Sequence, residues 1–301
     1  MKNHQKITKA VIAVAGYGTR FLPATKNQPK EMLPIIDKPI IHYLVEEAVK
    51  SGIKDIILIT RFGQHIMEDY FDSNLELEHM LESAGKTDLL ESIKEIANMA
   101  NFIYVRQKKD LPYGNGTPLL CVKDLIDDDE HFVYMFGDDL TLAEKPVTLQ
   151  LIEKHQKQSA RATLGVQEVP HDEINRYASI EYKKDTKYKY EMLRGHEKLP
   201  IEEAPSNMAQ FGRFVFSYDV IDAATRANTG KDGELWVIDI LNSLVEEGKK
   251  VIAPPIDGEW LTTGDPLRYL KATFRFALKR DDIGNKLVEY LKGYINEGKE
   301  S

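Results

Sequence analysis

Short apolar runs alternate with segments of helical periodicity along most of the chain. Apolar runs at 10–15, 55–60, 102–105 and 131–136 predict buried strands, and the spacing of apolar positions in 40–51 predicts a helix. A strand, a helix and a further strand in this order form a right-handed βαβ unit with parallel strands. The pattern therefore predicts an α/β fold, with a Rossmann-like, mixed and mostly parallel sheet flanked by helices.

The later periodicities extend this arrangement. Residues 61–100 are expected to be mostly helical, and we interpret their two apolar stripes, at 75–81 and 89–96, as ordinary packing faces. Further elements are predicted in chain order: a helix at 148–155, a strand at 162–169, a hairpin tip at 183–190, a helix from about 235, a strand at 251–254, and helices at 267–279 and 283–296. Without repeats or low-complexity linkers, the 301 residues are expected to form one domain with a helical tail at 267–301.

The first predicted strand runs directly into a glycine turn that is followed by cations. Gly16, Gly18 and Arg20 come straight after the strand, and Lys26 and Lys30 follow a few residues later. Glycine permits a positive φ and a close approach, so such a turn presents backbone N–H groups to an anion. An arginine fork suits phosphate oxygens. We interpret the turn as a phosphate site, the alternative being a plain βα turn with solvated cations.

The residues of this turn and those after it resemble the sugar nucleotidyltransferases, most of all the bacterial UTP–glucose-1-phosphate uridylyltransferases. The shared motifs are G-Y-G-T-R at 16–20, P-A-T-K at 23–26 and P-K-E-M-L-P at 29–34. The resemblance implies the nucleotide-diphospho-sugar transferase fold, with a nucleotide-binding N-terminal half and a sugar-phosphate-binding C-terminal half. It also implies transfer of a uridylyl group from UTP to α-D-glucose 1-phosphate by Mg²⁺-assisted in-line attack, with release of pyrophosphate.

The resemblance assigns Arg20 and Lys30 to the triphosphate and the leaving pyrophosphate. It places nucleotide contacts at Ala15, Gly16, Gly18, Thr19, Gln107, Gly114 and Gly116. A glutamine at a strand end can pair a donor and an acceptor with a base edge, although Gln107 can also be a plain turn residue. The loop 108–118 departs from the family, because it is two residues longer and has G-N-G-T-P in place of G-L-G-H-A. The preferred base therefore stays open.

Two carboxylates follow the strand at 131–136. Asp138 matches the family's magnesium aspartate and Asp139 is the second choice, with a helix N-cap as the structural alternative. Mg²⁺ combines few carboxylates with phosphate oxygens and water. Thr262 stands where relatives have a second metal-binding aspartate. Three alternatives follow: Asp265 replaces that aspartate, Asp138 and Asp139 hold the metal together with substrate phosphates and water, or the protein is a non-catalytic relative. We expect that Asp138 and Asp139 hold the metal with substrate phosphates and water.

The C-terminal half resembles the family's sugar-phosphate site. Ala178 stands at the glycine of a Y-G-V motif, Glu197 and Lys198 match V-E-K-P, and Asn207 belongs to A-P-S-N. The resemblance implies that Glu197 holds sugar hydroxyls and that Lys198 holds the sugar phosphate, which are chemically sensible pairings. Outside this series of motifs, a Glu-Lys pair would be an ordinary surface feature.

Composition limits the partners of the protein. A net charge of −8 gives no support to nucleic-acid binding, and a single cysteine, Cys121, excludes an internal disulfide and a cysteine-rich zinc site. Cys121 is expected to be a buried, inert thiol. The N-terminus lacks an apolar signal core and no apolar run reaches membrane-spanning length, so we expect a cytoplasmic enzyme without a membrane partner. The resemblance implies a homo-oligomer, with the number of subunits left open.

Three other functions remain in view. The first is a related nucleotidyltransferase that uses dTTP or another sugar phosphate. The second is a non-catalytic regulator that binds a nucleotide sugar, which would have no need to keep Arg20 and Lys30. The third is an NAD-binding domain. The glycine turn suggests it, but such domains normally have the motif G-x-G-x-x-G, and this turn lacks the third glycine.

Overall fold

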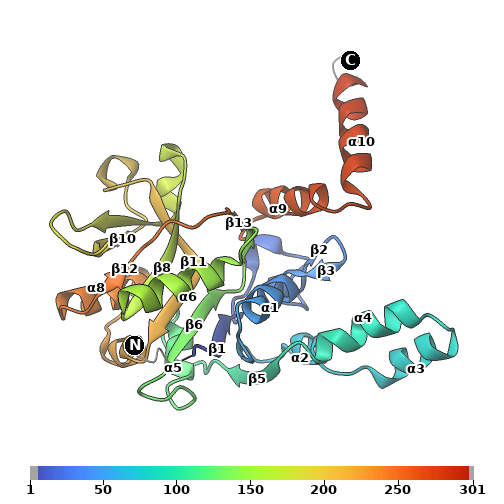
Figure 1. Ribbon diagram of the computed structural model, residues 1–301, viewed down its shortest axis with the longest axis horizontal. Helices are drawn as coiled ribbons and strands as arrows, with labels where there is room; N and C mark the ends of the chain where they lie inside the picture. The colour runs from blue at the N-terminus through green and yellow to red at the C-terminus, as the bar shows by residue number, and fades with distance from the viewer. Residues whose placement is uncertain (1–5, 298–301) are drawn as a thin grey trace.

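A mixed sheet forms the centre of the computed structural model, which describes residues 6–297 (Figure 1). Within this range the sheet has nine strands in the order β10-β9-β11-β6-β1-β4-β5, with β8 and β12 branching from β11. The strands are β1 (Lys9–Ala13), β4 (Asp55–Thr60), β5 (Asn101–Arg106), β6 (His131–Phe136), β8 (Ala162–Glu168), β9 (Ala178–Tyr182), β10 (Met192–Glu197), β11 (Met208–Ser217) and β12 (Val251–Ile252). One continuous sheet therefore contains strands from both halves of the chain.

The N-terminal part of the sheet is parallel. Strands β5, β4, β1 and β6 pair in parallel, whereas β11 runs antiparallel to β6. Parallel strands carry their carboxyl ends to one edge of a sheet, where ligands of α/β proteins bind. The loops that follow Ala13, Thr60, Arg106 and Phe136 therefore meet at this edge.

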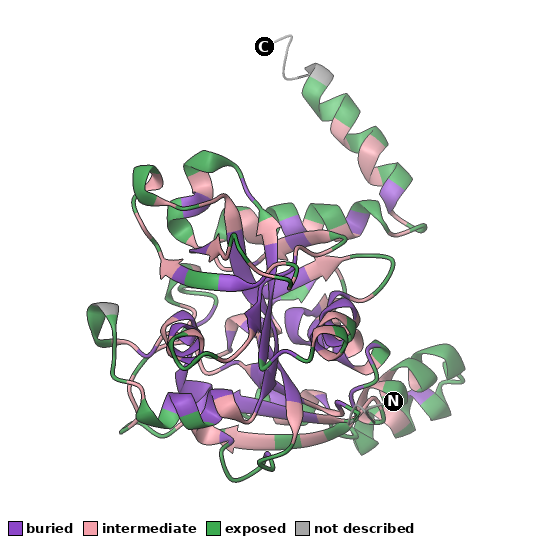
Figure 2. Cartoon of the chain, turned by 60° about the vertical axis from the view of Figure 1, so that its left-hand side comes forward, coloured by how far each residue is buried: buried purple, intermediate pink, exposed green. Residues whose placement is uncertain are grey.

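Apolar layers cover both faces of the sheet. Ile12 and Leu58 point into the layer that contains helices α1 (Ile40–Lys50) and α6 (Val147–Gln158). Val11 and Ile57 point into the opposite layer, because successive side chains of a strand alternate between faces. That layer contains α5 (Thr117–Cys121), α7 (Asp219–Arg226) and α8 (Val237–Glu246). Figure 2 shows the buried residues concentrated in the strands and on the helix faces toward them. The predicted α/β sheet flanked by helices is confirmed.

A buried ion pair ties one helical layer to the sheet. Arg213 of β11 is fully buried, and its Nη2 lies 2.8 Å from Oε2 of Glu47 in α1. The same carboxylate accepts hydrogen bonds from Thr141 Oγ1 at 2.8 Å and from Thr148 N at 2.9 Å. Removing one partner of such a pair leaves an uncompensated charge, at a cost of about 3–5 kcal/mol. The pair thus holds α1, α6 and β7 (Asp139–Leu142) against β11.

Helices α2 (Ile66–Tyr70), α3 (Leu75–Ser83) and α4 (Thr87–Ala97) follow β4, and the last two form an outlying hairpin (Figure 1). The interpretation of their apolar stripes as ordinary packing faces is wrong for much of the surface. Leu75 is 76% exposed, Met80 50% and Leu89 54%, whereas Leu81 is buried. These positions face solvent because α3 and α4 extend away from the sheet. In α4 the interpretation holds better, since Leu90, Ile93 and Ile96 are half-buried and Ile96 packs against the core.

The C-terminal tail consists of two helices. Helix α9 (Pro266–Leu278) begins at Asp265, whose side chain caps it, and α10 (Gly284–Glu297) extends away from the body (Figure 1). Both predicted helices are confirmed; residues 298–301 of the predicted tail lie outside the described range. No helix in residues 6–297 is long and apolar enough to span a membrane.

The remaining elements are short. They are β2 (Pro34–Ile35), β3 (Lys38–Pro39), β13 (Glu259–Thr262) and the 3-10 turns Thr19–Phe21, Lys30–Met32, His171–Arg176, Ile201–Glu203 and Lys231–Gly233. The predicted hairpin tip at 183–190 joins the antiparallel strands β9 and β10, as expected. Cys121 is half-buried rather than fully buried, and burial raises the pKa of its thiol to about 11, which keeps it protonated and unreactive.

Candidate active site

The glycine turn after β1 packs closely against Lys30. Gly18 has φ +62°, and a Cβ added there would lie 3.2 Å from Lys30 Cβ and 3.2 Å from Thr25 Cγ2. The Thr25 hydroxyl donates a hydrogen bond of 2.8 Å to the Gly18 carbonyl. The left-handed φ favours glycine at this position. The turn and the lysine of the P-K-E-M-L-P motif therefore form one local unit.

Lys30 and Asp138 form an ion pair at the carboxyl edge of the sheet. Lys30 Nζ lies 2.6 Å from Asp138 Oδ2, although the two residues are 108 positions apart in the sequence. Burial works against both charges, yet Asp138 holds the pKa of Lys30 above its ordinary value. Lys30 in turn holds the pKa of Asp138 below its usual range despite burial. The site therefore contains a charged ammonium and a charged carboxylate at neutral pH.

Gly264 brings Arg20, Asp138 and Thr262 to one place. Arg20 Nη1 donates to the Gly264 carbonyl over 3.2 Å. A Cβ added to Gly264 would lie 3.4 Å from Asp138 Oδ2, 3.4 Å from Thr262 Oγ1 and 3.6 Å from Arg20 Nη1. The backbone N–H of Thr263 also donates to the Asp138 carbonyl at 2.7 Å. Three residues predicted from separate motifs thus surround the space beside Gly264, where a Cβ would make ordinary van der Waals contacts with all three.

Asp139 faces away from this space. Its Oδ2 accepts a hydrogen bond from Gly212 N at 2.8 Å, and its Oδ1 accepts one from Trp260 Nε1 at 2.8 Å. Burial raises the pKa of Asp139 to about 6. Both oxygens are therefore engaged by protein donors, which argues against Asp139 as the second metal ligand. Asp139 begins strand β7, so the alternative of a helix N-cap is wrong for it.

A cavity of about 250 Å³, here called the central cavity, opens beside the ion pair. The predicted residues Ala15, Gly16, Lys30, Gln107, Gly114 and Asp138 all line it. Gly114 has φ +133°, and a Cβ there would lie 2.3 Å from the Leu235 carbonyl oxygen, so its loop docks on Leu235 through glycine alone. The cavity runs from an amide suited to a base edge to a cation–carboxylate pair suited to phosphate.

The predicted sugar-phosphate residues gather around the end of β10. Glu197 pairs with Ala178 across strands β10 and β9. Lys198 follows with φ +47°, and its Nζ lies 3.2 Å from Glu197 Oε1 and 4.2 Å from the ring centroid of Trp236. Because Trp236 lines the central cavity, it connects Glu197 and Lys198 to the predicted nucleotide residues.

Sequence comparison identifies the family of this chain. The sequence model of the family described as Nucleotidyl transferase matches residues 9–277. The chain belongs to this family. The UTP–glucose-1-phosphate uridylyltransferase of Bacillus subtilis is 40% identical over 293 residues, covering 97% of this chain and 99% of that protein. A second relative, UTP–glucose-1-phosphate uridylyltransferase 2 of Staphylococcus saprophyticus, is 41% identical over 288 residues, covering 96% of this chain and 98% of that protein.

Solved structures agree with this membership in the nucleotidyl transferase family. A UDP-glucose pyrophosphorylase complexed with UDP-glucose superposes with a TM-score of 0.81 at 33% identity, over 91% of this chain and 100% of that chain. The UTP-bound enzyme of Acinetobacter baumannii superposes with a TM-score of 0.84 at 32% identity, over 95% of this chain and 99% of that chain. The family resemblance that the sequence motifs carry is therefore confirmed, and a similarity to NAD-binding domains is not needed to explain the glycine turn.

Several predicted residues of this nucleotidyl transferase do not line the central cavity, among them Thr19, Gly116 and Asn207. Thr19 is exposed at the start of a 3-10 turn, and the Gly116 N–H donates to the Leu235 carbonyl at 2.8 Å. The Asn207 side-chain oxygen lies 2.9 Å from His171 Nδ1. Gly116 therefore anchors its loop. Thr19 and Asn207 stay predictions as ligand contacts.

Sequence reasoning missed several cavity residues of this nucleotidyl transferase. Glu31, Tyr113, Asn115, Glu234 and Trp236 line the central cavity with the predicted set. Glu31 is buried and its Oε2 has no hydrogen-bond partner; burial raises the pKa of this carboxyl to about 8. The available signal was the motif itself, because an acidic residue directly after Lys30 lies beside the same phosphate site. Glu234 and Trp236 precede α8, and no local pattern placed them near β1.

The residues around Gly264 are suited to hold Mg²⁺ only when substrates supply further oxygen ligands. The described residues contain no group of three His, Cys, Asp or Glu side chains able to hold a metal by themselves. Asp138 offers a carboxylate and Thr262 a neutral hydroxyl, and both groups lie close to Gly264. Asp265 is engaged elsewhere, since its Oδ1 accepts from Arg268 N at 3.0 Å and its Oδ2 from Arg268 Nη1 at 2.9 Å. This donor set suits a cation that takes most of its oxygens from phosphate and water.

Proposed function

We propose that this protein transfers the uridylyl group of UTP to α-D-glucose 1-phosphate, giving UDP-glucose and pyrophosphate. The observation that carries this proposal is the meeting of Arg20, Lys30 and Asp138 at the glycine turn, in a chain about 40% identical over nearly its full length to enzymes of that name. This site favours the catalytic function over a non-catalytic regulator, because a regulator has no need for cations at the leaving group.

The reaction needs positioning and charge neutralisation more than a nucleophilic side chain. A phosphate oxygen of the sugar phosphate attacks the α-phosphorus of UTP, and a new P–O bond forms. The bond from that phosphorus to the oxygen bridging it to the β-phosphate breaks, and pyrophosphate leaves with the electron pair. The attacking phosphate is already an anion, so no general base is required. In-line phosphoryl transfer depends mainly on orientation and electrostatics.

The residues divide between the two substrates. The Gln107 amide reads the edge of the uracil, while Ala15 and Gly114 line its pocket. Glu31, with its unpartnered Oε2, is suited to bind a hydroxyl of the nucleoside. Glu197 holds the sugar hydroxyls and Lys198 holds the incoming phosphate. These assignments place the attacking oxygen on the side of Trp236 and the leaving pyrophosphate on the side of the glycine turn.

Arg20 and Lys30 stabilise the charge that builds up on the leaving pyrophosphate. Both side chains reach the Asp138 side of the site, and Lys30 keeps its proton because Asp138 raises the pKa of its ammonium. Mg²⁺ held by Asp138, with Thr262 nearby, would supply further neutralisation of the phosphates when bound. Asp138 thus serves two cations, since its carboxylate pairs with Lys30 and is also the proposed metal ligand.

We further propose a cytoplasmic homo-oligomer. The proposed substrates are metabolites of the cytoplasm, which supports the location. Exposed large apolar side chains on α9 and α10 support association: Leu267, Leu270, Phe274, Tyr290 and Tyr294 are 60%, 52%, 41%, 68% and 67% exposed. Light scattering after gel filtration tests this, and a mass of one chain at micromolar concentration would reject the oligomer.

One assay tests the proposed reaction directly. Purified protein is incubated with Mg²⁺, one nucleoside triphosphate and one sugar 1-phosphate, and both pyrophosphate and the nucleotide sugar are quantified. UTP with glucose 1-phosphate should give the highest kcat/KM in a panel that includes dTTP, CTP and galactose 1-phosphate. A higher kcat/KM with dTTP would favour the related nucleotidyltransferase. No turnover with any pair would favour the non-catalytic regulator.

A further inference from the structure

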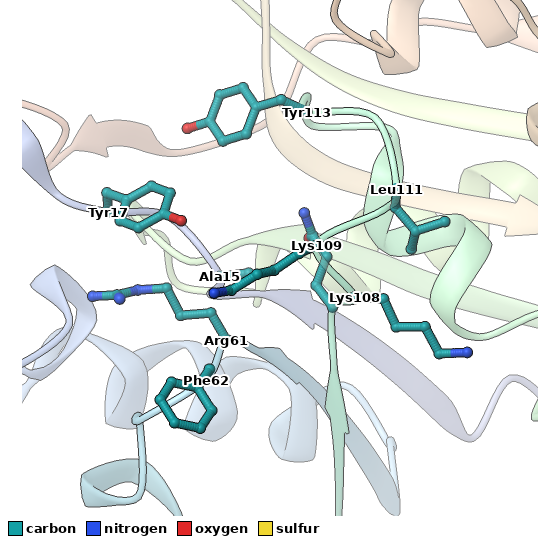
Figure 3. A pocket seen from close by; sticks show the side chains of 9 residues that line it. Ala15, Tyr17, Arg61, Phe62, Lys108, Lys109, Leu111 and Tyr113 are labelled. Carbon is teal, nitrogen blue, oxygen red and sulfur yellow. The ribbon is translucent and has the colours of Figure 1, made fainter.

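A second cavity of about 510 Å³ lies next to the central cavity (Figure 3). We call it the cationic cavity; its lining residues are Ala15, Tyr17, Arg61, Phe62, Gln107, Lys108, Lys109, Leu111 and Tyr113. Ala15, Gln107 and Tyr113 also line the central cavity, so these residues form a wall common to both. The volume falls within the range of about 300–1,000 Å³ that small-molecule sites occupy.

The charge of the cationic cavity is unusual for this protein. Three cations line it and no carboxylate does, in a chain whose net charge is −8. The described residues include no ion-pair partner for Arg61, Lys108 or Lys109. The Nε of Arg61 is buried without a hydrogen-bond partner. Uncompensated cations in a concave, partly desolvated space attract anions strongly.

Aromatic rings accompany these cations. The guanidinium of Arg61 lies 4.8 Å from the ring centroid of Tyr17, and Phe62 is 75% exposed. Figure 3 shows Arg61 and Lys109 extending toward the side of the cavity where Tyr17 lies, while Lys108 points away from them. Rings beside cations can stack on a base while the cations bind phosphate. The cavity thus combines the two kinds of contact that a nucleotide needs.

The loop that departs from the family supplies much of this cavity. Lys108, Lys109, Leu111 and Tyr113 all belong to the lengthened loop 108–118. The middle of this loop is anchored to the body, because the Leu235 N–H donates to the Tyr113 carbonyl at 2.7 Å. The extra residues are therefore held as a wall beside the central cavity.

We propose that the cationic cavity binds a nucleoside polyphosphate in addition to the UTP in the central cavity. The phosphates bind Arg61 and Lys109, and the base packs against the aromatic rings. Gln107 lines both cavities, whereas Lys30 and Asp138 line only the central one. A UTP whose base contacts Gln107 and whose phosphates bind near Lys30 therefore extends away from the cationic cavity. The occupant cancels the positive charge beside the UTP site and thereby weakens UTP binding. This site goes beyond the proposed transferase reaction and acts as its regulator.

Calorimetry with ATP, used as a purine probe, tests the site on the full-length protein in constant excess Mg²⁺. Binding of UDP-glucose is measured first, and ATP is then titrated with and without saturating UDP-glucose. ATP should bind in both conditions. Arg61→Met and Lys109→Met should each raise the Kd for ATP at least tenfold. Lys286→Met, which removes a lysine from the outlying helix α10, should leave that Kd unchanged.

Steady-state kinetics supply the second readout. With increasing ATP the apparent KM for UTP should rise to a plateau, because both nucleotides bind at once, and this rise should be lost in Lys109→Met. The proposal is overturned if saturating UDP-glucose abolishes ATP binding, or if the apparent KM rises linearly without a plateau, since either result means one shared site. An unchanged Kd for ATP in both variants would also overturn it.

Discussion

Replacing Lys30 with methionine tests the centre of the proposed mechanism. Methionine keeps most of the apolar stem that packs against Gly18 but removes the ammonium group that lies 2.6 Å from Asp138. Two effects are expected. Charge on the leaving pyrophosphate loses a cation, and Asp138 loses its partner inside the protein.

The magnitude follows from the geometry of the pair. At 2.6 Å, an effective dielectric constant of ~20 gives a gross attraction of about 6 kcal/mol, most of which desolvation offsets. Removing one partner of a buried pair costs about 3–5 kcal/mol of stability. The side chains of Lys30 and Asp138 are 19% and 25% exposed, so solvent screening favours the lower end of that range. Loss of a group that stabilises developing charge lowers kcat by about 10²–10³-fold.

The pH dependence of the variant separates these effects from general damage. In the wild type, Lys30 holds the pKa of Asp138 below its ordinary value, so the carboxylate stays charged above about pH 4. Without Lys30, burial raises that pKa. The acid limb of the kcat/KM profile should therefore move to higher pH in Lys30→Met.

The assay is UDP-glucose formation from pH 5 to pH 9, with Lys26→Met as the matched control. Lys26 is exposed and lies in the same stretch, so its loss removes an equal charge without breaking the pair. The reasoning is refuted if Lys30→Met loses less than about tenfold in kcat, roughly 1.4 kcal/mol of barrier. An equal loss in Lys26→Met would refute it too, because the effect would then be one of net charge.

Four further predictions concern the base, the metal, the cap of α9 and a buried acid. Gln107→Ala should reduce the preference for UTP over CTP, which differ at the pairing edge; an unchanged ratio of their kcat/KM values would reject Gln107 as the base reader. Thr262→Asp should tighten Mg²⁺ binding in calorimetry with UTP present, because a carboxylate is a stronger ligand than a hydroxyl. Asp265→Ala should leave Mg²⁺ binding in the same assay, and the activity, nearly unchanged. It should lower the stability by about 1 kcal/mol, because α9 loses its cap. Loss of Mg²⁺ binding in this variant would show that Asp265 is a ligand. Burial raises the pKa of Glu31 from 4.5 to about 8, so the stability that its protonated form provides is complete below about pH 4.5 and declines as pH rises to about 8. The Glu31→Gln variant has no ionisable group at this position, so its free energy of unfolding should rise relative to that of the wild type, by up to about 5 kcal/mol, as pH increases between those values. A constant difference between the melting temperatures of the two proteins from pH 5 to pH 8.5 would contradict this.

Local sequence patterns determined most of the secondary structure and one end of the site. The strands at 55–60 and 131–136 were predicted with the bounds that the structure has, because a short apolar run between polar residues leaves a buried strand little choice of register. The glycine turn and Lys30 were predicted as one phosphate site, and they are neighbours in the chain. In such cases the interacting groups are close in sequence, so a local pattern contains the information.

The tertiary structure decided what each element contacts. The apolar stripes of α3 and α4 were predicted correctly as helix faces, but periodicity does not say whether a neighbour covers a face, and Leu75 and Met80 are exposed. Asp138 and Asp139 look alike in sequence, yet Asp138 lies in the turn after β6 and pairs with Lys30, whereas Asp139 begins β7 and accepts hydrogen bonds from Gly212 and Trp260.

The central cavity depends in the same way on distant parts of the chain. Glu234 and Trp236 reach it because the loop 108–118 docks on Leu235, a backbone contact between segments more than a hundred residues apart. Glycine at position 114 makes that contact possible, since a Cβ there would meet the Leu235 carbonyl. The sequence alone identified the glycine as a loop residue. The role of Gly114 in docking the loop is evident only in the folded structure, where the two segments meet. A close approach depends on both segments, so neither segment predicts it from its own sequence.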